Sequence, residues 1–131
     1  MTDPVFVQLE GAQIVPGGDT PIPVPSGQAV TLQDVIWNVP GPEGLTLRFR
    51  FIAPQIARDS GTVGYDIAAA DMQHLCQAYA LPRISEFGPH PAQIIISLSD
   101  VPVPFGEATP DATQFFDAFS VQDGTCIWEI Y

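Results

Sequence analysis

The chain has 131 residues, a length typical of one domain, and carries 15 acidic residues against four arginines and no lysine, for a formal net charge of −11. Phosphate contacts depend on clustered lysine and arginine, so this balance argues against nucleic acid and against anionic membrane surfaces. The absence of lysine excludes Schiff-base and P-loop chemistry, and no segment approaches the roughly 20 apolar residues of a membrane span. The acidic surface favours solubility, or contact with a basic protein partner.

Residues 1–27 form a proline- and glycine-rich N-terminal arm with short β-like runs at 5–9 and 12–15. Pro21, Pro23 and Pro25 provide no amide donors, so this segment favours an extended path outside a sheet. The arm lies on the domain, docks on a neighbour, or is an unstructured terminus. Residues 28–131 are expected to form a single α+β domain.

Two strands should follow the arm. The first spans residues 28–39 and changes its apolar parity near Gln33 and Asp34, which predicts a bulge. The turn-rich residues 40–44 predict a long hairpin loop. The second strand, residues 45–51, places leucine and phenylalanine on one face and threonine and arginine on the other.

Residues 66–79 are predicted to form the principal helix, capped by Asp66 and ended by Pro82. Helical spacing gathers one apolar stripe: Ala68, Met72, Leu75, Cys76 and Tyr79. We expect this stripe to pack on the leucine and phenylalanine face of residues 45–51.

The remaining elements complete the sheet. One helical turn is expected after Pro54 and another at residues 109–111, while residues 92–99 predict a central strand buried on both faces. Residues 115–121 and 125–131 predict a final hairpin, with a helix over residues 110–119 as the competing interpretation. The predicted fold is therefore α+β, a single-layer, mainly antiparallel sheet in the order β-β-α-β-β-β with one principal helix on one face.

The two cysteines are each expected to face the core. Cys76 lies on the inward edge of the helix, and Cys126 shares a strand face with Trp128 and Ile130, which alternation also turns inward. A disulfide is one interpretation, and it would indicate an oxidising compartment. Two separate buried thiols, or a reactive or metal-binding thiol, are the alternatives.

The sequence carries no catalytic or metal-binding signature, and we expect no catalytic residue, metal site or cofactor. His74 lies two residues from Cys76, about 200° around the helix, and His90 lies between two prolines. No zinc knuckle, calcium loop or serine elbow is present. The acidic residues leave glycoside hydrolysis open without supporting it.

Arginine is scarce, and Arg48 and Arg50 emerge on the strand face opposite the helix. They are expected to pair with acidic neighbours across the strands, or to form an anion or partner contact with aromatic residues such as Trp37 and Tyr65.

Six motifs resemble those of an uncharacterised family of small, often exported bacterial proteins. They are VPSGQAVTLQDVIW at 24–37, LRFRFIAPQIAR at 47–58, DMQHLC at 71–76, IISLSD at 95–100, TQFFDAF at 113–119 and DGTCIWE at 123–129. Some members carry an acetolactate synthase label, but this chain is far too short for that enzyme and has no thiamine-diphosphate signature. The resemblance implies a shared fold and no catalytic residues.

The preferred functional hypothesis is a non-enzymatic accessory or protein-binding module of the bacterial cell envelope that contacts another protein. The alternatives are a small-ligand-binding protein or small hydrolase-like enzyme with a pocket beside the main helix, and a subunit of a larger complex. A removed signal peptide would make the protein periplasmic or secreted, with a cytoplasmic location as the alternative.

Overall fold

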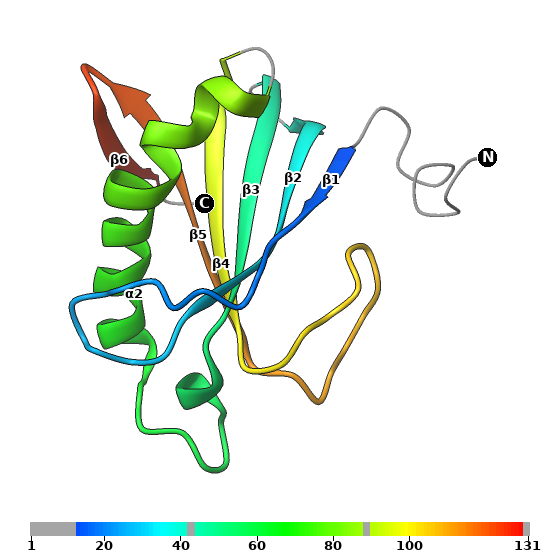
Figure 1. The fold of residues 1–131 in the computed structure, drawn as a ribbon, viewed down its shortest axis with the longest axis vertical. Coiled ribbons are helices and arrows are strands. Elements are labelled where there is room, and N and C mark those ends of the chain that lie inside the picture. Colours follow the sequence, from blue (N-terminus) through cyan, green and yellow to red (C-terminus); the bar gives the residue numbers. More distant parts are fainter. Residues whose placement is uncertain (1–12, 42–43, 88–89, 130–131) are drawn as a thin grey trace.

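A six-stranded sheet organises the fold, with its strands in the order β1-β2-β3-β4-β5-β6 (Figure 1). The computed structural model describes residues 13–41, 44–87 and 90–129. The strands are β1 (Gln13–Pro16), β2 (Thr31–Gly41), β3 (Gly44–Ile52), β4 (Gln93–Ser99), β5 (Gln114–Gln122) and β6 (Thr125–Glu129). Neighbouring strands are antiparallel except β3 and β4, which run parallel because the helical segment connects them. The predicted α+β class and mainly antiparallel sheet are confirmed.

The β2–β3 hairpin confirms the predicted bulge, because the register shifts between Leu32 and Asp34. A second shift lies between Trp37 and Val39. The expected long loop is wrong, since the pairing continues to Gly41 and Gly44 and leaves only residues 42–43 between the strands. The φ of +131° at Gly44 explains this tight connection, because a residue with a side chain rarely adopts that conformation.

The principal helix α2 (Tyr65–His74) continues through a π-helical turn, η2 (Leu75–Ala80), and a 3₁₀ segment, η3 (Leu81–Phe87). Asp66 is not its cap: the helix begins after Gly64, and Asp66 lies in the first turn, where its charge favours the helix dipole. The predicted end at Pro82 is also wrong. Pro82 lies where the π-helical turn changes to 3₁₀ geometry. Because the hydrogen-bonding pattern of the helix changes there, the missing amide of proline interrupts no regular helical hydrogen bonding.

The predicted apolar stripe of the helix is confirmed, because Ala68, Met72, Leu75 and Cys76 are fully buried and Tyr79 packs against the same core. The stripe lies on the predicted Leu/Phe face of β3, where the Tyr79 ring meets the rings of Phe49 and Phe51 edge-on. Alternate residues of the central strand β4 complete this layer: Ile94, Ile96 and Leu98. The core therefore lies between the sheet and α2, which Figure 1 shows crossing one face.

The other face of the sheet is partly covered by the loop of residues 100–113 between β4 and β5. Val103 is buried there, and its carbonyl accepts hydrogen bonds from Gln33 and Arg50. The predicted helical turn at 109–111 is a single turn with an Ala112 amide to Thr109 carbonyl bond. With this cover, β4 is buried on both sides as predicted.

The N-terminal arm adds the edge strand β1 to the sheet and then crosses the helix layer. Its anchor is the fully buried Asp71 of α2, whose carboxylate accepts bonds from the Ser26 amide and hydroxyl and from the Gln28 side chain. Val24 is buried and belongs to the core cluster. The described part of the arm therefore lies on the domain, whereas the predicted strand at residues 5–9 lies outside the described residues.

The final hairpin joins β5 and β6 through Asp123 and Gly124, both with positive φ, as the mirror-image turns of hairpins require. The competing helix over residues 110–119 is therefore wrong. Trp128 lies on the predicted face of β6, together with Cys126, but it is 51% exposed, whereas Cys126 is 3% exposed. Alternation gave the correct face of β6, but the helix covers only the first part of this edge strand.

Candidate functional site

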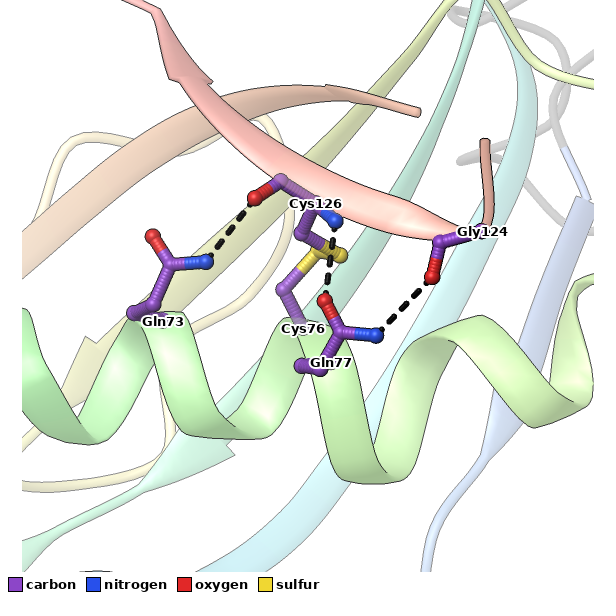
Figure 2. The surroundings of a disulfide bond; sticks show 5 residues. All are labelled: Gln73, Cys76, Gln77, Gly124 and Cys126. Carbon is purple, nitrogen blue, oxygen red and sulfur yellow. Dashed lines mark hydrogen bonds between the residues drawn. A yellow bond between two sulfur atoms is a disulfide. The ribbon is translucent and has the colours of Figure 1, made fainter. Parts of the chain in front are cut away.

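A disulfide joins Cys76 of η2 to Cys126 of β6, with the two Cα atoms 6.2 Å apart (Figure 2). The bridge closes a sequence separation of 50 residues and attaches the helical layer to the edge of the sheet. Of the three interpretations of the cysteines, the structure supports the disulfide. Such a bond is compatible with an oxidising compartment.

Two glutamines reinforce this attachment, as Figure 2 shows. The Gln77 side chain accepts a bond from the Cys126 amide at 2.9 Å and donates one to the Gly124 carbonyl at 3.0 Å. The Gln73 side chain donates to the Cys126 carbonyl at 2.9 Å. The outer backbone edge of β6 is therefore occupied around Cys126 by side chains of the helix.

An open cleft of about 330 Å³ continues from this attachment, between the N-terminal half of α2 and the last two strands. We call it the α2–β6 cleft, and it is lined by Tyr65, Ala69, Ala70, Gln73, Asp117, Phe119 and Trp128. The two alanines leave space on the helix side. The Trp128 and Tyr65 side chains are 51% and 42% exposed, so the aromatic walls are accessible.

Asp117 gives the cleft its charge. This residue is 8% exposed, and its Oδ1 accepts the Tyr65 hydroxyl bond at 2.8 Å. The hydrogen bond to the Asp117 carboxylate raises the pKa of Tyr65 above its ordinary value, with partial burial and the charges of Asp117 and Asp66 adding to the effect. The Tyr65 ring is held edge-on against Phe115, with the ring centres 5.5 Å apart. The cleft therefore combines a fixed carboxylate with open aromatic faces.

The four residues predicted as a partner or anion contact do not come together. Arg50 is buried opposite the helix, where it forms a two-pronged ion pair with Asp34 at 2.7 and 2.8 Å. The Arg48 and Arg50 guanidinium groups lie 5.7 and 5.4 Å from the Phe105 ring centre. This arrangement matches the cross-strand pairing that the sequence suggested and holds the 100–113 loop on the sheet.

The two predicted aromatic residues lie on the helix side of the sheet. Trp37 is half-buried and packs against the core, whereas Tyr65 lies in the α2–β6 cleft. Of the predicted contact residues, Tyr65 is thus the one that lines this cleft.

Two features of the cleft, Asp117 and the exposure of Trp128, were not predicted from the sequence. The signal for Asp117 was available, because strand alternation places it between Phe115 and Phe119 on the inward face. An acidic residue at an inward strand position indicates either a buried pair or an open site. The exposure of Trp128 depends on how closely α2 approaches β6, where Ala69 and Ala70 leave space, and local sequence does not encode that distance.

Neither histidine lines the α2–β6 cleft. Among residues 13–41, 44–87 and 90–129, no three metal-ligating side chains form a cluster, and no helix is long and apolar enough to cross a membrane.

The fold and this site define a small disulfide-bonded α+β domain with an acidic aromatic cleft beside its main helix. Residues 7–131 match DUF6497, a family of unknown function, and the chain belongs to that family. The predicted resemblance to a family without an established activity is confirmed. No curated protein and no solved structure matches the chain.

Proposed function

We propose that the protein is a non-enzymatic binding module that receives a positively charged side chain of a partner protein in the α2–β6 cleft. The observation that carries this proposal is the position of Asp117, a carboxylate only 8% exposed that lines an open cleft together with Tyr65 and Trp128. We propose further that it acts in an oxidising compartment such as the bacterial cell envelope, which the disulfide supports.

The chemistry of the cleft suits an ammonium or guanidinium group. Asp117 receives one hydrogen bond from Tyr65, and an ionised carboxylate accepts several more. Exposed indole and phenol faces attract cations by about 0.5–2 kcal/mol each, depending on desolvation. No arginine lines the cleft, and the neighbouring charge of Asp66 adds to its negative potential.

The charge of the whole chain supports the same partner class. A net charge of −11 attracts basic partners over long range and repels a second acidic copy. The affinity for a basic segment should accordingly fall with added salt.

A small-ligand-binding protein or small hydrolase-like enzyme is the second candidate, because the cleft does lie beside the main helix. Its volume is near the lower end of typical ligand sites, roughly 300–1,000 Å³. Of the groups that such an enzyme could use, the Asp117 carboxylate lines the cleft, whereas His74, His90, Arg48 and Arg50 do not. Asp117 and Tyr65 alone suit recognition better than acid–base catalysis.

Three peptides of sequence Thr-Val-Thr-X-Thr-Val-Thr, with X as lysine, norleucine or glutamate and both ends blocked, test the proposal. Calorimetric titration should give a dissociation constant roughly tenfold lower for lysine than for norleucine and no measurable binding for glutamate. The Trp128 indole signal should shift in NMR spectra with lysine peptide. Asp111→Asn, at an exposed position outside the cleft, is the matched charge control and should bind like the wild type. Equal affinities for lysine and norleucine would refute the proposal.

A further inference from the structure

The outer backbone edge of β6 is hydrogen-bonded to helix side chains at one position and open at another. Cys126 pairs with Val121 of β5, yet its amide and carbonyl bond Gln77 and Gln73, so both groups point away from β5 (Figure 2). Backbone groups in a strand alternate in direction with a period of two residues. The amide and carbonyl of Trp128 therefore also point outward, beside the α2–β6 cleft.

The helix explains why this part of the edge is open. Gln73 and Gln77 are four residues apart and face β6 on successive helical turns. The residue one turn earlier on that face is Ala69, which lines the cleft and has no hydrogen-bonding side chain. Within the described part of the chain, helix side chains thus occupy the outer edge of β6 at Cys126 and leave it uncovered at Trp128.

We infer that the edge of β6 at Trp128 receives an extended segment of the partner by β-strand addition, and that this segment carries the basic side chain into the cleft. The inference rests on the proposed function and specifies the form of the partner. Two main-chain bonds to Trp128 supply affinity, and the side chain in the cleft supplies specificity.

Strand geometry links the two contacts. A residue directly opposite Trp128 that exchanges both backbone bonds projects its side chain on the same sheet face as Trp128, which is the cleft face. The incoming strand lies about 4.8 Å from β6 and so about 10 Å from β5. Because Asp117 lies two residues along β5 from Phe119, the partner of Trp128, the Cα of the incoming residue is about 12 Å from the Cα of Asp117. A long lysine or arginine side chain spans this distance, and a short basic side chain does not.

Backbone N-methylation of the lysine peptide separates the two contacts. Methylating the lysine amide removes the bond to the Trp128 carbonyl and should weaken binding at least tenfold, whereas methylating the preceding amide, which points away, should change it less than threefold. Replacing lysine with diaminopropionic acid should weaken binding to the norleucine level. Equal effects of the two methyl groups would overturn strand addition while the lysine preference, and with it the proposed function, still stood. Loss of the lysine preference itself would refute both.

A variant of the helix provides a second test. Ala69→Gln places a third glutamine in line with Gln73 and Gln77, where it is expected to occupy the Trp128 backbone and lower peptide affinity about tenfold. Ala70→Gln also places a glutamine in the cleft lining, but outside the row of Gln73 and Gln77, and should lower peptide affinity less. Equal losses in the two variants would contradict the edge contact. A wild-type dimer that Ala69→Gln dissociates on sizing would assign the edge to a second copy of the chain and overturn the assignment to a partner.

Discussion

Removing the disulfide should destabilise the protein by an amount that the structure allows to be estimated. Cys76 and Cys126 are separated by 50 residues, and closing a loop of that length restricts the unfolded chain by about 4 kcal/mol at 25 °C. The total free energy of unfolding of a domain is roughly 5–15 kcal/mol, so the bridge contributes a large share. For a chain of this length the expected fall in Tm is about 12–20 °C.

The folded structure should nevertheless survive this loss. Gln73 and Gln77 form three hydrogen bonds to the backbone of the β6 hairpin, each contributing about 1 kcal/mol. They keep β6 beside the helix when the sulfur atoms are no longer joined. We therefore expect the reduced protein to retain its far-UV circular dichroism at 25 °C.

The assay compares thermal and urea unfolding of the oxidised wild type, the reduced wild type and the double variant Cys76→Ala/Cys126→Ala. Reductant should lower the Tm of the wild type and leave the double variant unchanged. The reduced wild type separates the loss of the bridge from the cavities left by alanine. Two reactive thiols in denatured, unreduced wild type, or a reduction effect below about 1 kcal/mol, would refute the reasoning.

Three further substitutions probe other contacts. Asp71→Ala leaves the buried Gln28 side chain without an acceptor and releases Ser26 of the arm, so it should cost about 3 kcal/mol in urea unfolding and speed proteolysis of residues 17–25. Unchanged proteolysis would contradict the anchor. Arg50→Ala should lower the free energy of unfolding by roughly 3–5 kcal/mol, because it leaves the buried Asp34 carboxylate without its partner. The double variant Asp34→Leu/Arg50→Met should recover most of this stability. A double variant as unstable as Arg50→Ala would contradict a simple buried ion pair. Tyr65→Phe should cost about 1 kcal/mol at pH 7. Because the folded-state pKa of Tyr65 is raised, the stability difference between wild type and Tyr65→Phe should be fully present below the ordinary tyrosine pKa. It should vanish as the pH rises through the raised folded-state pKa. A stability difference independent of pH would contradict the Tyr65–Asp117 bond.

Local pattern predicted most of the fold. The alternation in β3, the parity change at Gln33 and the apolar stripe of the helix each depend on residues close in sequence, and the structure confirms all three. The wrong predictions concern features whose local structure depends on pairing and packing with other parts of the chain. Pro82 is accommodated by a change of helical register, and the β2–β3 turn is shortened by continued pairing up to Gly44.

The candidate site was less predictable from the sequence because the α2–β6 cleft forms where the helix and the last two strands do not pack closely. Alternation assigned Trp128 to the correct face, but its exposure depends on how far α2 covers β6. Arg48 and Arg50 were predicted as candidate contact residues because arginine is scarce, yet they stabilise the loop of residues 100–113 on the opposite face. Alternation places Asp117 at an inward strand position, but the open cleft that makes its carboxylate accessible depends on contacts between distant elements.

The most direct test of the central claim is a double-mutant cycle between the Asp117 carboxylate and the charge of the peptide. The ratio of norleucine to lysine dissociation constants is measured for the wild type and for Asp117→Asn, with Asp111→Asn as control. We expect a ratio of about ten in the wild type and the control, which corresponds to 1.4 kcal/mol, and a ratio near one in Asp117→Asn. An Asp117→Asn protein that folds normally and keeps the wild-type ratio would contradict recognition of a cation by this cleft.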